Sequence, residues 1–361
     1  MTSNQDPVPP APGPPVSGPT GATAAVADAS HSPAKSRGRG VSVPEVAALV
    51  VVLVALFVFF SITSQYFLNP ENLVNILQNV AVVGIIACPA TLIMIAGQFD
   101  LSVGSAVGFV SMLAAVAALA PGAGGTEVPW SGDLPLFGAL AVAMAGAILI
   151  GVVNAFFVTG VGINALITTL GTLAIFRGLT KVLGNGQTIR IDGFGWLGVN
   201  RIFGIPIPVY IFIAAIVIFW FILKYTVYGR SMFAIGASPT AARLAGIRTK
   251  RLIAIGFVIT SACAGLAGLI RLSQVGGASV NGGLGIELSV VTAVVLGGTS
   301  LAGGKGGILG TVLAVLIIGV LGNGLIQLNV PSFWIEVAGG ALLLGAVSVD
   351  RLRVRVTHSD V

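Results

Sequence analysis

Charged residues are scarce in this chain. Only 8% of its 361 residues are Asp, Glu, Lys or Arg, whereas soluble globular proteins contain about 25%. Hydrophobic residues make up 55% of the chain. A water-exposed surface on a protein of this size needs more charge than 18 basic and 12 acidic residues provide. The composition therefore excludes an ordinary soluble enzyme and indicates that lipid surrounds most of the chain.

Cysteine and histidine are scarce as well. Cys88 and Cys263 are the two cysteines and each lies in an apolar run, so the sequence offers neither a disulfide framework nor a metal cluster. His31 and His358 lie in the polar tails, which argues against histidine-based catalysis and proton relay. We expect no catalytic residue, no metal site and no enzymatic activity.

Apolar stretches of about 20 residues, the length that spans a bilayer, recur from Val46 to Val349. They predict helices at 45–63, 79–97, 101–120, 136–158, 163–183, 208–225, 252–270, 287–303, 307–327 and 332–349. Residues 1–40 are rich in Pro, Ala, Ser and Gly and predict a disordered cytoplasmic tail. Residues 351–361 form a short second tail after a transmembrane domain at 41–350. The fold class we expect is an all-α polytopic membrane protein with about ten transmembrane helices.

The positions of Lys and Arg predict the orientation, because short cytoplasmic loops carry an excess of both. With ten spans and both termini in the cytoplasm, 13 of the 18 basic residues fall on the cytoplasmic side. The other five are Arg177, Lys181, Arg190, Arg201 and Arg271. Basic loops facing an anionic membrane also account for the net charge of +6 without a nucleic-acid partner.

Two pairs of segments suggest an internal repeat. Phe99–Val107 resembles Ile286–Val294, with an acidic residue followed by Leu-Ser in both, and Ile148–Val152 resembles Leu316–Val320. The paired segments lie five predicted spans apart, and helices five apart run in opposite directions. We therefore predict a 5+5 inverted repeat, an arrangement in which solutes bind where the halves meet at interrupted helices.

The connection between Lys224 and Arg251 carries basic residues and no acidic ones. Ser238 suits a helix N-cap, Pro239 suits the first helical position, and Gly246 can end the helix in a left-handed conformation. A short separate helix is therefore expected here, with a low-relief alanine surface that suits docking of a cytoplasmic partner. The alternative is an ordinary basic loop between two spans.

Four motifs give the chain a specific resemblance. In chain order they are Asp100–Ser105, Thr169–Thr172 with Arg177–Gly178, Gly229–Arg230 with Ala234–Ile247, and Ala293–Gly306. Together they resemble the inner-membrane permease subunits of bacterial ABC sugar importers of the ribose type, over roughly residues 70–350. Gln98-Phe99 departs from the Gly-Ile expected before the aspartate, which bears on substrate identity.

The resemblance implies a function and a set of partners. It implies import of a monosaccharide, pentose-like, across the bacterial inner membrane by alternating access. ATP would be bound by two cytoplasmic ATP-binding subunits, so this chain itself needs no cofactor. A second permease copy and an extracytoplasmic sugar-binding protein would complete the assembly. The ATPase-coupling loop would be 226–251, with its central residues Gly236, Ser238, Pro239, Ala241, Ala242, Arg243 and Gly246.

The run Thr299–Gly306 has the appearance of a phosphate-binding loop. The pattern G-x-x-x-x-G-K-[ST] requires Gly at the place of Thr299 and Ser or Thr at the place of Gly306. Glycines there instead predict a tight turn between spans, with Lys305 facing the cytoplasm.

Polar residues within or beside the spans are the candidates for the solute path. Asp100, Arg271 and Glu287 lie near predicted span ends, where they serve as gate residues or, alternatively, as helix-end stabilisers. We expect Arg271 and Glu287 to pair. Neutral polar groups suit a sugar, and the pathway residues we expect are Asn79, Asn164, Thr168 and Asn323. The alternative role for each is a hydrogen bond between helices.

Three other functions remain open at this point. A branched-chain amino acid permease shares the general plan, but its substrate carboxylate needs a cation or helix N-terminus that the sequence does not clearly supply. A cation-coupled secondary transporter normally has carboxylates in mid-membrane. A membrane-bound transferase needs clustered acidic or histidine residues, whereas the external loops offer only Glu127, Asp133 and Asp192.

Overall fold

The computed structural model describes residues 43–122, 128–191 and 193–358, and within the chain Gly38–Val361 form one compact unit. The predicted tail at 1–40 and the loop residues Glu127 and Asp192 lie outside the described residues. The helices are α1 (Val43–Thr63), α2 (Pro70–Ile95), α3 (Val103–Ala118), α4 (Leu136–Ala155), the π-helix η2 (Phe156–Val161), α5 (Ala165–Leu183), α6 (Ile207–Tyr225), α7 (Val227–Ala237), α8 (Pro239–Leu244), α9 (Thr249–Val275), α10 (Ile286–Leu296), α11 (Ile308–Gln327) and α12 (Ser332–His358).

Seven helices in the described part of the chain are long and apolar enough to cross a membrane: α1, α2, α4 with η2, α5, α6, α9 and α11. Each of the ten predicted ranges overlaps a helix, but α3, α10 and the apolar part of α12 are shorter than a full span. The structure thus agrees with an all-α polytopic membrane protein, and the number of ten spans stays a prediction. Two boundaries also differ from expectation. Helix α12 continues past residue 350 to His358, and the basic connection after Lys224 is mostly helical, as α7 and α8.

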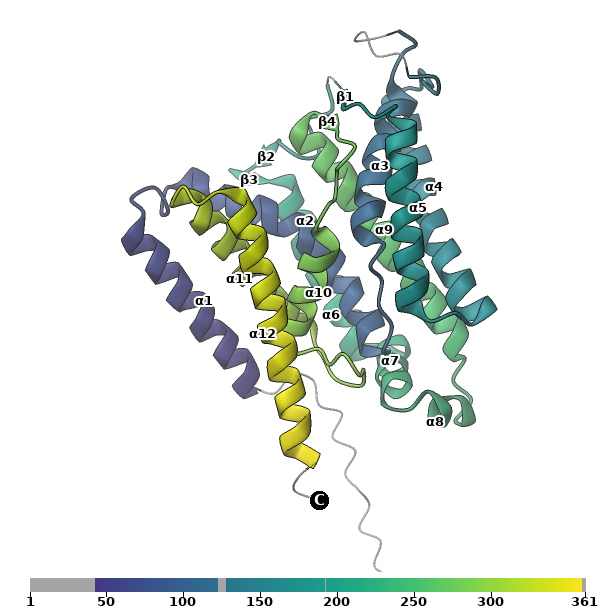
Figure 1. The fold of residues 1–361 in the computed structure, drawn as a ribbon, viewed down its shortest axis with the longest axis vertical. Helices are drawn as coiled ribbons and strands as arrows, with labels where there is room; N and C mark the ends of the chain where they lie inside the picture. Colours follow the sequence, from purple (N-terminus) through teal and green to yellow (C-terminus); the bar gives the residue numbers. More distant parts are fainter. Residues whose placement is uncertain (1–42, 123–127, 192, 359–361) are drawn as a thin grey trace, which may run out of the picture. The chain divides into compact units, whose positions relative to one another are not determined.

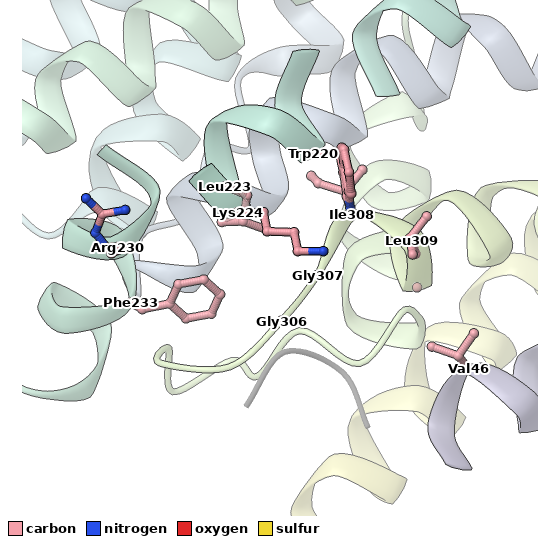
Figure 2. Close-up of a pocket in the computed structure, with 11 residues that line it drawn as sticks. Val46, Trp220, Leu223, Lys224, Arg230, Phe233, Gly306, Gly307, Ile308 and Leu309 are labelled. Carbon is pink, nitrogen blue, oxygen red and sulfur yellow. The ribbon is translucent and has the colours of Figure 1, made fainter. Parts of the chain in front are cut away.

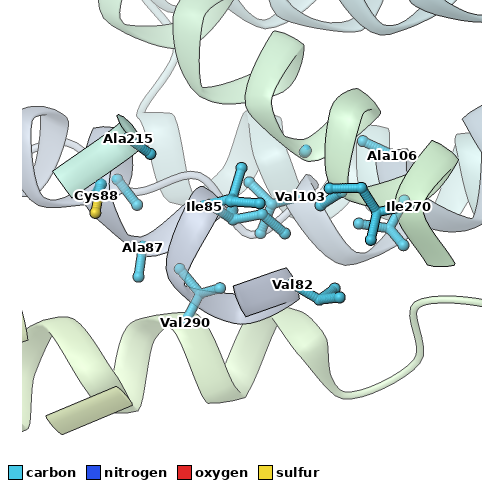
Figure 3. Packing of buried hydrophobic residues seen from close by; sticks show 14 of the residues in the cluster. Val82, Ile85, Ala87, Cys88, Val103, Ala106, Ala215, Ile270 and Val290 are labelled. Carbon is cyan, nitrogen blue, oxygen red and sulfur yellow. The ribbon is translucent and has the colours of Figure 1, made fainter. Parts of the chain in front are cut away.

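Helix α9 packs against α2, α3 and α4, and Figure 1 shows it beside α3 and α4. In the most apolar 18-residue stretch of α2, 78% of the residues are buried inside the protein, whereas in α1 only 6% are buried. Both are strongly apolar, so hydropathy alone does not separate a core helix from one that faces lipid. The packing of α2 distinguishes it as a core helix: Figure 3 shows Ile85 of α2 beside Val103 of α3, with Ile270 of α9 nearby.

The two ends of the helix assembly differ in structure. One end carries four short strands: β1 (Ile189–Arg190) pairs antiparallel with β4 (Gly277–Ala278), and β2 (Arg201–Ile202) pairs with β3 (Ile205–Pro206). Figure 1 shows α7 and α8 at the opposite end, where α1 begins and α12 ends. We call these the strand end and the α8 end.

Candidate translocation and coupling sites

Helices α3 and α10 each follow a longer helix after a short irregular segment, which we call an interruption. Residues 96–102 separate α2 from α3, and residues 276–285 separate α9 from α10. The second interruption packs against α3: a Cβ built on Gly108 of α3 would lie 2.2 Å from the carbonyl oxygen of Gly282. Gly283 has a φ of +78° and lies against the backbone of Gly104. Glycine is required on both sides because the backbones meet directly.

A buried polar network fixes the first interruption. Asp100 Oδ1 accepts hydrogen bonds from the backbone N–H and the hydroxyl of Ser102, at 2.9 and 2.5 Å. Asn154 of α4 donates to Ser102 Oγ at 2.8 Å, and Thr172 of α5 donates to Asn154 Oδ1 at 2.7 Å. Thr172 lies near the middle of the 19-residue α5, so the network sits well inside the helix assembly. In this network Asp100 stabilises the start of α3, which is the helix-end role. Only one of its carboxylate oxygens takes part, because Oδ2 is buried without a partner among the described residues.

The second interruption is held by an ion pair. Glu287, in the first turn of α10, accepts a hydrogen bond from Arg177 of α5 at 3.0 Å. The expected pair with Arg271 is wrong in this structure, because Arg271 lies on the exposed side of α9 and donates to Gln274 at 3.5 Å. Glu287 instead faces α5 and the glycine surface of α3, where its side chain fills the space beside Gly104. Arg177 lies inside α5, within the helix predicted at 163–183.

The four expected pathway residues are not brought together. Asn79 is exposed on α2, and Asn323 of α11 exchanges hydrogen bonds of 2.9 and 3.0 Å with Asn72. In this structure Asn323 therefore has the alternative role, a hydrogen bond between helices. Asn164 is the N-cap of α5 and accepts from Leu166 N–H at 2.9 Å. Thr168, one turn later, is buried with an unpartnered hydroxyl.

Helix α8 forms where the sequence predicts a short separate helix. Ser238 Oγ accepts from the N–H of Ala241 at 3.2 Å, Pro239 occupies the first turn, and Gly246 has a φ of +82°. The two alanines differ, since Ala242 is buried and Ala241 is exposed. Sequence reasoning missed Leu244, whose side chain is 86% exposed. The signal was available, because Leu244 is a large apolar residue directly after Arg243, within the segment predicted to form a docking helix.

Helix α7 joins α8 to the rest of the protein through direct backbone contacts. A Cβ on Gly236 would lie 1.9 Å from the carbonyl oxygen of Ile95 and 2.4 Å from the backbone nitrogen of Gly304. The N–H of Gly304 donates to that same carbonyl at 2.8 Å. Gly303 and Gly304 have φ of +84° and +75°, so the glycine-rich run is the turn expected between α10 and α11. Lys305 in this turn is exposed.

A cavity of about 410 Å³ lies between these two regions. It is bounded by Gly97, Gln98 and Phe99 just before Asp100, by Asn164 at the start of α5, and by Arg243 of α8. The cavity therefore connects the α8 end with the first helix interruption. Among the described residues, no group of three His, Cys, Asp or Glu side chains is placed to hold a metal ion.

Comparison with known proteins identifies relatives over most of the chain. The ribose import permease protein RbsC of Escherichia coli strain K12 is 37% identical over 307 residues, which covers 83% of this chain and 92% of that protein. The L-arabinose ABC transporter permease protein AraH of Azospirillum brasilense is 32% identical and covers 90% and 93%. The D-allose transport system permease protein AlsC of Escherichia coli strain K12 is 33% identical and covers 84% and 90%. No solved structure matches the chain.

These relatives are permeases, which confirms the expectation that the chain is not an enzyme. The model of the family described as "Branched-chain amino acid transport system / permease component" matches residues 72–347, a range that contains both helix interruptions and the whole of α7 and α8. The chain therefore belongs to this family of transport-system permease components.

Proposed function

We propose that this chain is the transmembrane subunit of an ABC importer that carries a monosaccharide, pentose-like, across the bacterial inner membrane. The observation that supports this best is the similarity, over 83–90% of the chain, to permeases named for ribose, L-arabinose and D-allose. The family description names branched-chain amino acids, but the relatives named here are all sugar permeases. The amino acid alternative is accordingly not favoured.

The coupling step is proposed to begin at α8. ATP would close the partner ATPase subunits and displace α8, whose Ala241 and Leu244 are exposed for contact. Helix α7 would carry the displacement to the carbonyl of Ile95 and to Gly304, with which Gly236 is in backbone contact. The end of α2 leads directly into residues 96–102 and the Asp100 network. The spans would then exchange outward-open and inward-open packings.

The 5+5 inverted repeat is part of this proposal. Helix α2 is followed by an interruption and the short α3, and α9 is followed by an interruption and the short α10. An acidic residue lies near the start of each short helix: Asp100 lies in the interruption just before α3, and Glu287 lies in the first turn of α10. Interrupted helices that meet between two halves are typical of transporter binding sites.

For the solute path we propose the neutral polar groups nearest the first interruption. Asn164 borders the cavity beside α8, and Thr168 offers an unpartnered buried hydroxyl one turn further along α5. Sugar hydroxyls need donors and acceptors of this kind, and neutral partners do not trap the solute. Asn79 and Asn323 stay predictions, which are tested by replacing each of the four residues with an apolar residue of similar size and measuring sugar uptake.

The α8 end is proposed to face the cytoplasm, with both termini on that side. Seven basic residues lie in or beside the connections at that end: Lys224, Arg230, Arg243, Arg248, Lys250, Arg251 and Lys305. Four lie toward the strand end, namely Lys181, Arg190, Arg201 and Arg271. This imbalance follows the positive-inside pattern.

The partners in the proposed assembly are two ATPase subunits, a second copy of this chain and an extracytoplasmic sugar-binding protein. Helix α5 offers a surface for the second copy. Gly171, Ala174 and Gly178 share its exposed side, and a Cβ on either glycine would meet nothing within 4 Å. Small residues of this spacing let membrane helices approach closely.

Reconstitution tests the proposal. The full chain is purified with its ATPase subunit, placed in liposomes with a ribose- or arabinose-loaded binding protein, and supplied with ATP. We expect sugar uptake that depends on ATP and no uptake of leucine. Uphill uptake by the permease alone, driven by an ion gradient, would identify a secondary transporter and refute the proposal. ATP-dependent uptake of leucine in place of sugar would support the amino acid alternative.

A further inference from the structure

A second cavity, of about 580 Å³, lies at the α8 end and is distinct from the cavity that borders α8 (Figure 2). Its walls come from the start of α1, the last turns of α6, helix α7 and the turn that leads into α11. The side chains are mostly apolar, including Val46, Leu223, Phe233 and Leu309. No residue of α8 lines it. We call it the α1–α6 pocket.

The α1–α6 pocket also contains positive charge. Figure 2 shows the Lys224 side chain extended toward Gly307 and Ile308, with Arg230 on the far side of Phe233. The Lys224 ammonium lies 5.1 Å from the ring centroid of Trp220 and 5.3 Å from that of Tyr225. The two rings hold the cation in place by cation–π attraction. Lysine flanked by Trp and Tyr is typical of the level of lipid headgroups.

Nothing in the described part of the chain neutralises this charge. The one ion pair among the described residues joins Arg177 and Glu287 on α5 and α10. Helix α11 adds to the positive potential, because it begins at Ile308 and its N-cap Gly307 has no side chain to accept from the first N–H groups. The pocket therefore combines a cation, a helix start and an apolar wall.

An amphiphilic anion satisfies all three features. We propose that the α1–α6 pocket binds an anionic phospholipid of the cytoplasmic leaflet, with its phosphate at Lys224 and the start of α11 and its acyl chains on the apolar wall. Helix α1, which borders the pocket, is the least buried of the seven spanning helices, so hydrocarbon can continue from the pocket into the bilayer. The choice of leaflet rests on the proposed orientation of the α8 end.

The phospholipid is favoured over the ATPase subunit as the occupant. A soluble partner reaches α8, which is exposed and lies outside this pocket, whereas the pocket opens between α1 and α6, two helices that present apolar side chains outward. A phosphate in free solution would use Lys224 but leave Leu223, Phe233 and Leu309 without a partner. The apolar wall is thus the feature that selects a lipid.

Native mass spectrometry of the full chain tests the proposal, with phosphatidylglycerol and phosphatidylcholine of identical acyl chains as probes. One basic residue contributes about 1 kcal/mol of attraction to anionic lipid, so Lys224→Ala should lower phosphatidylglycerol binding about fivefold. Lys224→Arg should retain binding. Lys305→Ala is the matched control, because Lys305 is an exposed lysine at the same end that does not line the pocket.

Several outcomes would overturn the proposal. One is that Lys224→Ala binds phosphatidylglycerol as well as the unaltered chain does. Another is that the unaltered chain binds phosphatidylcholine as well as phosphatidylglycerol. Displacement of the lipid by millimolar inorganic phosphate would indicate a free-phosphate site, and loss of ATPase co-purification in Lys224→Ala with lipid retained would indicate a protein contact. The orientation is tested separately by labelling Ser238→Cys with an impermeant maleimide. Labelling from outside the cell refutes the proposed orientation and leaves the lipid measurement intact.

Discussion

The contact between Gly236 and the end of α2 gives the sharpest test of the coupling path. In Gly236→Ala the new methyl group would lie 1.9 Å from the carbonyl oxygen of Ile95, and real Cβ contacts essentially never fall below 3.0 Å. Both neighbours, Ile95 and Gly304, meet it with backbone atoms, which cannot turn away as a side chain can. The backbones must therefore separate by about 1 Å, and overpacking of this kind costs about 1–3 kcal/mol.

Two measurements follow the effect of Gly236→Ala. Thermal unfolding in detergent should begin at a lower temperature, and ATP-driven sugar uptake in proteoliposomes should fall about tenfold or more, the equivalent of about 1.4 kcal/mol. Co-purification of the ATPase subunit should persist, because the exposed residues of α8 are unchanged. This combination separates a coupling defect from a docking defect.

Gly339→Ala is the matched control. Gly339 lies within α12, has no positive φ, and a Cβ there would meet nothing within 4 Å. The same substitution in a helix without a clash is neutral or stabilising by up to about 1 kcal/mol. If Gly236→Ala unfolds and transports like Gly339→Ala, the backbone contact does not carry the motion of α8 and the reasoning fails.

Three further predictions concern docking, the ion pair and the polar network. Ala241→Glu places a charge on the exposed side of α8 and should abolish ATPase co-purification without lowering the unfolding temperature; unchanged co-purification contradicts the docking role. A double-mutant cycle of Arg177→Met and Glu287→Gln should show a coupling energy of about 1–3 kcal/mol in thermal unfolding, whereas the same cycle with Arg271→Met in place of Arg177→Met should show none. Asn154→Leu removes the bridge between α4, α5 and Ser102 and should lower the free energy of unfolding by about 1–3 kcal/mol, measured by unfolding in detergent. If the variant is as stable as the unaltered chain, the network does not contribute to stability.

Local features of the sequence predicted local structure well. The caps at Ser238 and Gly246 define α8, because helix ends depend on side chains and backbone angles within a few residues. The glycines after Thr299 form the expected turn for the same reason, since positive φ is a property of the residue itself. The motifs also pointed to the family that the comparisons identify.

Polar pairing was predicted poorly. The partner of Glu287 is Arg177 and not Arg271, and Asn323 bonds to Asn72 on a helix about 250 residues away in sequence. Each polar residue in an apolar span has several possible neighbours, and the sequence does not say which helix faces which. The same ambiguity concealed the network that joins Asp100 to Asn154.

The scarcity of charge and the repeated apolar runs by themselves determined that this is a helical membrane protein, because a bilayer permits few other ways to satisfy the backbone. Only the tertiary structure decided that α2 is a core helix and α1 a lipid-facing one, since both are almost uniformly apolar. It also decided that the segment before α10 packs against α3, because that contact depends on glycines far apart along the chain that meet only when the helices pack.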